Sequence, residues 1–231
     1  MLEWYQAGAG WRDLIPDCVG LLCACQNAAG SKALVWRGNR ADVRRPWHEI
    51  SVAEAFTRYV GIDILATAPI PPDPDFALLA GEARRIGIEP HPGDDWETLY
   101  FRIFLHRIEP RLGLGAPTVL YDFPISMAAL ARRNPADPRL AERFELYVCG
   151  LELANAFGEL TDPAEQRARF FSDRAKKLAL YGETYPVDED FLAALEAGLP
   201  PAAGIALGFD RLVMLATGAA DIEEVLWVPV T

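Results

Sequence analysis

The chain has 231 residues, 51% of them hydrophobic, which favours one domain with a substantial buried core. Its formal net charge of −11 disfavours a broad nucleic-acid-binding surface, because such a surface needs clustered lysine and arginine. No apolar run is long enough to cross a membrane and no charged-then-apolar leader precedes Trp4, so we expect a cytoplasmic protein outside the membrane.

The first half of the chain predicts mainly helices. Ser51-Val-Ala-Glu54 is a capping box, in which the Ser51 hydroxyl and the Glu54 carboxylate each bind a backbone N–H group at a helix start. Asp94 or Asp95 caps another helix, whose apolar residues recur at helical spacing. In chain order, we expect helices over 11–26, 52–61, 76–86 and from 96 to just before 110, a short strand over 33–36 and a proline-rich connector over 68–75.

The cysteines and histidines predict no site. Cys23 and Cys25 form a C-x-C motif without a second pair or a nearby histidine, so a buried helix face is favoured over a metal site. The three histidines are scattered along the chain, and we assign them no chemistry.

The second half mixes strands and helices. Residues 117–123 predict an apolar strand, followed by a short helix to residue 131. The pair Asp162-Pro163 predicts an N-cap and a first-turn proline of a helix that runs to about residue 180. Asp188 caps a further helix that stops at Gly198. Composition alone allows an α/β or an α+β fold.

The stretch ERFELYVCGLELANAFGELTD, residues 142–162, carries the candidate chemistry. Apolar residues alternate along its first half as in a strand, and Gly150 tolerates the positive φ of a tight turn. A loop of Gly150 and the next residue would pair Cys149 with Glu152. Paired residues point the same way, so Glu145 and Glu152 would share one face.

Two carboxylates on one face repel each other, and a phosphate-bound divalent cation between them is the usual solution. In a regular strand, Asn155 and Glu159 have the opposite parity from Glu152. A bulge near Ala154 would bring all four polar groups to one side. The alternative is a surface hairpin with a solvated acidic face.

A second candidate stretch, GIALGFDRLVMLAT, covers residues 204–217. A short apolar run breaks at Gly208, and Asp210 and Arg211 then open an apolar helix. Arg211 is therefore expected in the first helical turn, beside unpaired backbone N–H groups that favour anions. Its guanidinium can stack on a base or bind a phosphate.

Together these stretches resemble the class II aminoacyl-tRNA synthetases of the lysine type. The first resembles the strand pair of the lysine-type enzymes, GIALGFDR resembles the third motif of the family, and the opening MLEWY resembles the tail of the second motif. The sequence is most similar to stand-alone paralogues that attach β-lysine to elongation factor P (ERFE, GxELANxFxELTD, GxALGxDRLVMLxxG). The close resemblance covers residues 1–5 and 116–218.

The resemblance implies an α+β fold, with an antiparallel sheet flanked by helices, in a single domain over residues 1–231 that is usually dimeric. It also implies that ATP and an amino acid form an aminoacyl-adenylate, and that the acyl group then moves to an amine or a hydroxyl. Catalysis of the first step is mainly in-line positioning and neutralisation of the triphosphate.

The resemblance assigns one group of residues to ATP and Mg²⁺. Glu145 and Glu152 would hold Mg²⁺ against the phosphates. Arg211, the catalytic residue, would clamp the nucleotide by stacking and charge. Gly208 would let the backbone approach the nucleotide, and Leu153 would line the same site through its main chain.

A second group would bind the amino acid. Glu159, with Glu3 and Tyr5, would receive the side-chain ammonium, and Asn155 would orient the carboxylate. A neutral side chain would leave the buried Glu159 unpaired, so this pairing also gives specificity.

Ala206 indicates the substrate more closely. Lysyl-tRNA synthetases usually have glycine here, whereas the elongation factor P ligases have alanine. A methyl group at the pocket wall, worth ~1–3 kcal/mol, makes a shift from lysine to β-lysine plausible. Elongation factor P is therefore the expected acceptor. The acidic charge and the lack of an anticodon-binding barrel make tRNA an unlikely one.

The sequence also departs from the family. Met127 and Ala156 stand where the resembling proteins usually carry glutamine and glycine. The chain starts inside the second motif, so we expect it to be incomplete. Three alternatives remain: an elongation factor P ligase, a non-catalytic binding or regulatory paralogue, and a fragment of a tRNA-charging enzyme.

Overall fold

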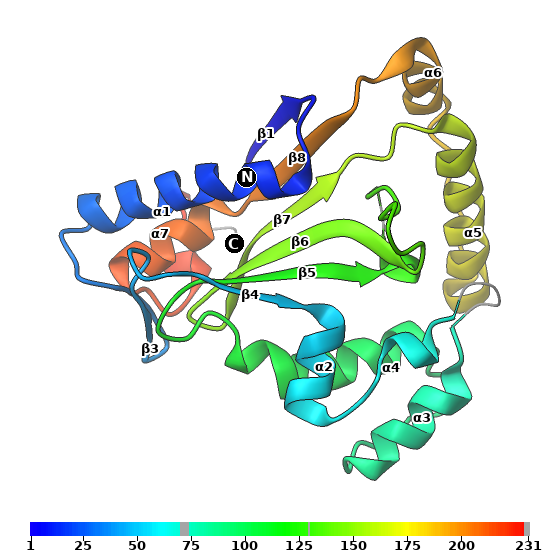
Figure 1. Ribbon diagram of the computed structural model, residues 1–231, viewed down its shortest axis with the longest axis horizontal. Helices are drawn as coiled ribbons and strands as arrows, with labels where there is room; N and C mark the ends of the chain where they lie inside the picture. The colour runs from blue at the N-terminus through cyan, green and yellow to red at the C-terminus, as the bar shows by residue number, and fades with distance from the viewer. Residues whose placement is uncertain (70–73, 129, 229–231) are drawn as a thin grey trace.

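The fold is built around strands from both ends of the chain (Figure 1). The computed structural model describes residues 1–69, 74–128 and 130–228. The described strands are β1 (Leu2–Ala7), β2 (Leu34–Trp36), β3 (Asn39–Ala41), β4 (His48–Ser51), β5 (Thr118–Pro124), β6 (Leu140–Val148), β7 (Leu151–Gly158) and β8 (Ala202–Leu207).

Six of these strands form one sheet in the order β1-β8-β7-β6-β5-β4, while β2 and β3 form a separate hairpin. All neighbours in the large sheet are antiparallel except β4 and β5, which are parallel. The first strand of the chain thus lies beside the last one, and the strand pair β6–β7 lies in the middle of the sheet.

The longer helices are α1 (Ile15–Ala28), α2 (Val52–Val60), α3 (Phe76–Arg85), α4 (Trp96–Ile103), α5 (Pro163–Tyr181), α6 (Glu189–Gly198) and α7 (Phe209–Thr217). Shorter 3₁₀ turns occupy Trp11–Leu14, Leu65–Thr67, Glu109–Arg111, Ile125–Met127 and Ile222–Glu224, and a π-helical turn follows α4 at Phe104–Ile108. The predicted α+β fold, with a mostly antiparallel sheet flanked by helices, is confirmed.

Two hydrophobic cores lie on opposite faces of the sheet. One face of β5–β8 packs against α1 and α7, through residues such as Leu22, Phe144 and Leu215. The core on the other side joins α2, α3 and α4 to the β4–β6 end of the sheet, where Leu120 and Tyr147 contribute. In Figure 1, α1 and α7 lie at one end of the molecule, α2 to α4 below the sheet, and α5 and α6 at the opposite end.

Several helix starts match their predicted caps. The Ser51 hydroxyl accepts the Glu54 N–H at 3.2 Å and the Glu54 carboxylate accepts the Ser51 N–H at 2.9 Å, so the capping box is confirmed. Asp95, one of the two predicted candidates, caps α4. Asp162 and Asp188 cap α5 and α6 as predicted.

Two predicted elements differ in the structure. The predicted helix over 11–26 is a 3₁₀ turn followed by α1, because Pro16 occupies the first turn of the α-helix. The short helix predicted to reach residue 131 is wrong. Among the described residues of this segment only Ile125–Met127 is helical, and Ala131 instead forms an antiparallel bridge with Glu159. Residue 129 and part of the connector over 68–75 lie outside the described residues.

Within the part of the chain that the structure describes, none of the helices combines the length and the apolar character needed to cross a membrane.

The Gly113→Ala variant should lose more stability than Gly115→Ala. Both glycines have positive φ (70° and 77°), which costs alanine about 1–2 kcal/mol. Only at Gly113 would the new methyl group also lie 2.6 Å from the Tyr147 carbonyl oxygen, whereas at Gly115 it meets nothing within 4 Å. Overpacking adds about 1–3 kcal/mol. Urea unfolding measures the difference, and equal losses would contradict the close packing against β6.

Candidate active site

The turn between β6 and β7 determines which residues of the two strands pair, and therefore which side chains share a face of the sheet. Cys149 and Gly150 have φ values of 59° and 82°, so these two residues form the loop and Tyr147 pairs with Glu152. The predicted loop of Gly150 and Leu151 is therefore wrong by one residue, and Glu152 pairs two residues earlier on β6 than predicted, with Tyr147 instead of Cys149. Distant contacts hold Cys149 in this conformation: its N–H donates to the Gly113 carbonyl at 2.7 Å, and its own carbonyl accepts from Asn39 Nδ2 at 3.1 Å.

A β-bulge then shifts the pairing by one residue, so that Asn155 comes to the same face as Glu152. Leu146 pairs with Ala154, and the next pair is Tyr147 with Glu152, so Leu153 is the extra residue. The predicted bulge exists, one position before Ala154. Beyond it, Glu145 pairs with Asn155.

The bulge places the predicted polar groups together. Tyr147 and Glu145 are two residues apart on β6 and therefore point to the same face. Their partners on β7 are Glu152 and Asn155, which share that face. This outcome confirms the prediction that a bulge unites these groups on one side of the hairpin.

The same face continues across β8 and β1. Asn155 pairs with Ala206, which pairs with Glu3. Two residues further along each strand, in the next row on the same face, Phe157 pairs with Gly204, which pairs with Tyr5. The four residues predicted to contact the amino acid on these strands, Glu3, Tyr5, Asn155 and Ala206, therefore lie in two adjacent rows of one face.

Glu159 completes this end of the face beside Tyr5. A methyl group on Gly204 would overlap Glu159 Oε1 and would lie 2.5 Å from Tyr5 Cε1. The absence of a side chain at Gly204 is therefore what lets the carboxyl group and the ring come together. Tyr5 is 67% exposed, so the pair is open to solvent on one side.

The electrostatics of this pair suit a cation. Burial raises the pKa of Glu159 to about 7, and the charge of Arg132 only partly opposes this shift. Burial, followed by the charges of Glu159 and Glu3, raises the pKa of Tyr5. A cationic group beside them would stabilise the carboxylate and could also contact the ring face.

The other end of the face is acidic. Glu145 is buried, and its two oxygens accept hydrogen bonds from Arg143 Nη2 and from the Tyr147 hydroxyl, each at 2.6 Å. The pKa of Glu152 is raised by burial first and then by the charge of Glu145, against the lowering effect of Arg211. Glu109 belongs to the same cluster, because its pKa is raised by burial, by Glu152 and by Glu145.

Arg211 lies where the acidic cluster meets α7. It is in the first turn of that helix, as predicted. Its Nη1 donates to the Glu152 carbonyl at 2.7 Å and lies 3.7 Å from Glu152 Oε2. The Gly208 N–H donates to the Leu153 carbonyl at 2.9 Å, and a methyl group on Gly208 would lie 3.3 Å from Arg211 Cδ. These contacts connect the four residues predicted to bind ATP, which are Glu152, Leu153, Gly208 and Arg211.

The described residues contain no preassembled metal cage of three or more histidine, cysteine, aspartate or glutamate side chains. The residues nevertheless fit Mg²⁺. That ion is commonly bound by one or two carboxylates together with substrate phosphates. Glu145 and Glu152 supply hard oxygen donors. Burial and then the charge of Glu145 raise the pKa of Glu152, so a cation between the two groups would stabilise its carboxylate.

The sequence-based prediction missed two residues of the face. Arg143 is only two positions before Glu145 on the same strand, so strand alternation could have identified it. Glu109 follows the π-helical turn after α4. Its position beside β6 and β7 depends on tertiary packing, for which the sequence gives no local signal.

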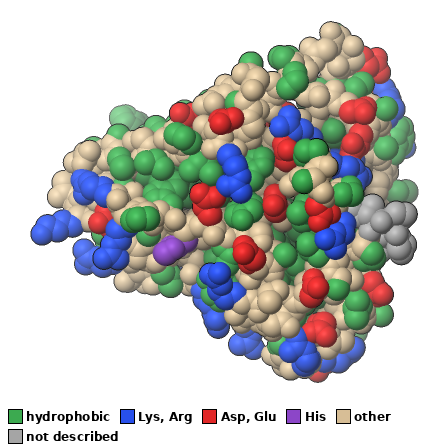
Figure 2. Space-filling view, viewed as in Figure 1, with side chains coloured by type: hydrophobic (Ala, Val, Ile, Leu, Met, Phe, Trp, Pro, Cys, Tyr) green, Lys and Arg blue, Asp and Glu red, His purple; other side chains and the backbone are tan. Residues whose placement is uncertain are grey.

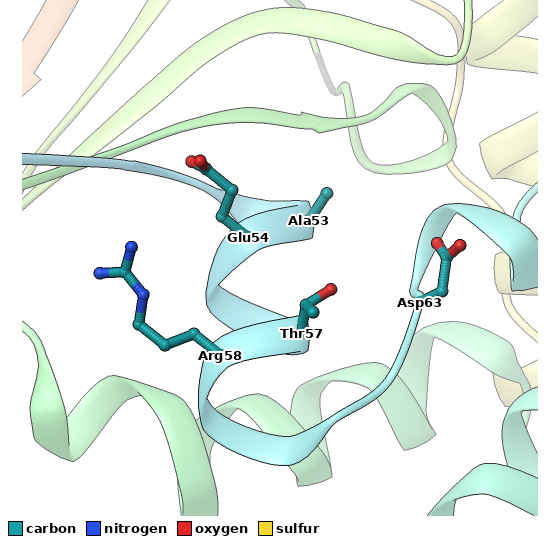
Figure 3. Close-up of a pocket in the computed structure, with 5 residues that line it drawn as sticks. All are labelled: Ala53, Glu54, Thr57, Arg58 and Asp63. Carbon is teal, nitrogen blue, oxygen red and sulfur yellow. The ribbon is translucent and has the colours of Figure 1, made fainter.

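Two hollows lie away from these residues. One of about 410 Å³ is lined by Ala53, Glu54, Thr57, Arg58 and Asp63 (Figure 3). Its Glu54 carboxylate already serves the α2 capping box. Another of about 560 Å³ lies between α1 and the segment before β4. The candidate site lies instead on one face of the sheet, and Figure 2 shows acidic side chains at several places over the central strands.

Comparison with known proteins gives a consistent match. The sequence profile of the tRNA synthetases class II (D, K and N) matches residues 1–231. An elongation factor P–(R)-β-lysine ligase of Vibrio cholerae is 41% identical over 231 residues, which are 99% of this chain and 64% of that protein. A lysine–tRNA ligase of Pelotomaculum thermopropionicum is 38% identical over 230 residues, covering 99% of this chain and 44% of that protein. The chain therefore spans less than two thirds of either relative.

The Glu159→Gln variant should change how stability depends on pH. Because the pKa of Glu159 is about 7 in the folded chain and 4.5 ordinarily, the folded state binds this proton more tightly than the unfolded state. The contribution of Glu159 to the free energy of unfolding is fully present below pH 4.5 and is lost as the pH rises through 7. Urea unfolding at pH 5 and pH 8 should show a smaller decline for Glu159→Gln than for the wild type. The exposed Glu196→Gln serves as control, and identical declines in all three proteins would contradict the assignment.

Proposed function

The chain belongs to the class II tRNA synthetases (D, K and N), and from this premise we propose that it activates lysine or β-lysine with ATP as an aminoacyl-adenylate. The observation that carries the proposal is the single polar face of the sheet. One end of this face offers a carboxyl group suited to a cation, and the other end offers acidic groups beside an arginine. An amino acid with a cationic side chain, lying along this face, would bring its carboxylate toward the nucleotide end.

At the amino-acid end, Glu159 pairs with the side-chain ammonium of the substrate. This carboxyl group is largely removed from water, which raises its pKa to about 7, so a neutral substrate side chain would leave it unpaired at a cost of about 1–3 kcal/mol. Glu3 and Tyr5 complete the ammonium site from β1, which β8 separates from β7, and Asn155 contacts the substrate carboxylate. These roles are carried over from the family resemblance, and the position of the residues on one face supports them.

At the nucleotide end, Arg211 contacts the nucleotide by stacking and charge, in the first turn of α7 where unpaired backbone N–H groups also favour anions. Glu145 and Glu152 would hold Mg²⁺, which neutralises phosphate charge when it is bound. Gly208 and the main chain of Leu153 shape the same surface, since the hydrogen bond between them joins α7 to β7.

The reaction requires positioning more than proton transfer. A carboxylate oxygen of the amino acid attacks the α-phosphorus of ATP, the bond to the bridging oxygen breaks, and pyrophosphate leaves with the electron pair. The residues of this chain hold the two reactants in line and stabilise negative charge on the phosphates. In a second step an amine or hydroxyl attacks the activated carbonyl and AMP leaves.

For the second step we propose a lysine side chain of elongation factor P as the acceptor. Ala206 supports this choice, because it pairs with both Asn155 and Glu3 and so places a methyl group at the amino-acid end. The second candidate is transfer to tRNA, which the similarity to lysine–tRNA ligases supports. A dimeric state and a cytoplasmic location stay predictions.

ATP–pyrophosphate exchange tests the proposal. Exchange should depend on lysine or β-lysine, and Arg211→Ala should lower kcat/KM about 100-fold because it removes charge stabilisation at the phosphates. Arg174→Ala, on α5, is the matched control. The assay should use both this chain and a version extended by its upstream reading frame. Absence of exchange in both proteins would overturn the proposal, and transfer to elongation factor P or to tRNA would decide the acceptor.

The Ala206→Gly variant tests amino-acid selectivity. Removing the methyl group should raise the ratio of kcat/KM for lysine to that for β-lysine about tenfold, since one methyl group is worth about 1–3 kcal/mol. The same exchange assay measures both values. An unchanged ratio would remove Ala206 from the determinants of selectivity.

A further inference from the structure

Arg143 lies on the polar face, two residues from Glu145 on β6 and opposite Phe157 on β7, and is held from several directions. Its side chain is only 13% exposed. Nη2 donates to Glu145 Oε1 at 2.6 Å, Nη1 donates to the Met127 carbonyl at 2.7 Å, and Nε donates to Asn155 Oδ1 at 3.2 Å. The guanidinium also lies over the ring of Phe123, with Cζ 4.4 Å from the ring centre. Three acceptors and a ring therefore fix its orientation.

These contacts determine which way the Asn155 amide points. A guanidinium can only donate hydrogen bonds, so the atom of Asn155 that faces Arg143 must be the carbonyl oxygen. The Nδ2 group is then directed away from Arg143. Among the residues that the structure describes, Nδ2 has no hydrogen-bond partner, and Asn155 is only partly buried.

We propose that Arg143 is a positioning residue that orients Asn155 so that the Nδ2 group faces the carboxylate of the bound amino acid. The proposal rests on the proposed function, in which Asn155 contacts that carboxylate. If the amide were reversed, its oxygen would face the carboxylate and repel it. Arg143 prevents this reversal because the reversed amide would set an N–H donor against its own N–H groups.

The geometry also explains why an arginine is needed. Lysine carries a single ammonium on a flexible chain and cannot hold three acceptors in a fixed fork. Arg143 joins the loop at Met127, the acidic group Glu145 and the amide of Asn155 within one planar group. It thereby links the nucleotide end of the face to the amino-acid end.

The first test is Arg143→Lys in the exchange assay. The KM for lysine should rise about tenfold, because a hydrogen bond to a charged group is weakened. In an Asn155→Ala background the same substitution should change the KM for lysine less than about twofold, since Arg143 acts through Asn155. Equal effects in both backgrounds would overturn the proposal. Arg139→Lys, an exposed arginine paired with Asp137, is the matched control.

A second variant covers the case in which Arg143→Lys does not fold. Asn155→Asp keeps an oxygen toward Arg143 and gains an ion pair, but it has no N–H to offer the substrate. It should fold normally and raise the KM for lysine at least as much as Asn155→Ala. A normal KM for lysine in Asn155→Asp would overturn the proposal.

A third measurement separates this proposal from the proposed function. If the wild type shows no exchange, the proposed function has failed, and the side-chain amide signals of Asn155 in the NMR spectrum still report on Arg143. Their order parameter should be high in the wild type and lower in Arg143→Lys. An unchanged order parameter would show that Arg143 does not fix the amide.

Discussion

The phase of the β6–β7 hairpin is the constraint on which the whole site depends. Side chains alternate along a strand, so a shift of one residue exchanges the two faces. The two left-handed residues of the turn and the bulge at Leu153 together place Glu145, Glu152 and Asn155 on the face away from α1 and α7. Without the bulge, either the carboxylates or the residues beyond them would point into a hydrophobic core.

Negative charge is the second constraint, and the chain balances it only in part. Glu145 receives both an arginine and a tyrosine hydroxyl, which satisfy a buried carboxylate well. Glu152, Glu109 and Glu159 are less completely paired, and burial raises the pKa of each. Groups of this kind are common at functional sites, because a cation or a positively charged substrate stabilises their charged form when it binds. The same groups lower the stability of the unliganded fold.

Much of the fold could be predicted because the signals are local. The capping box of α2 and the aspartate caps of α4, α5 and α6 depend only on residues within one helical turn. The errors arose where distant residues decide the backbone. Cys149 adopts a left-handed conformation because Gly113 and Asn39, far away in sequence, hold it there. Ala131 leaves the predicted helix because it bridges to Glu159. The predicted site residues lie together, whereas their chemical roles follow from the resemblance and stay predictions.

Positions 204 and 206 are neighbours on β8 but differ in their freedom to change. At Gly204, a methyl group would overlap Glu159 Oε1 and would lie 2.5 Å from Tyr5 Cε1, so any side chain there would displace the two residues that we propose bind the substrate ammonium. Ala206 lies one row away, opposite Asn155 and Glu3, where a gain or loss of one carbon only reshapes the wall. Under the proposed function, divergence of substrate range on this scaffold is therefore open to small evolutionary steps at residue 206 and closed to them at residue 204.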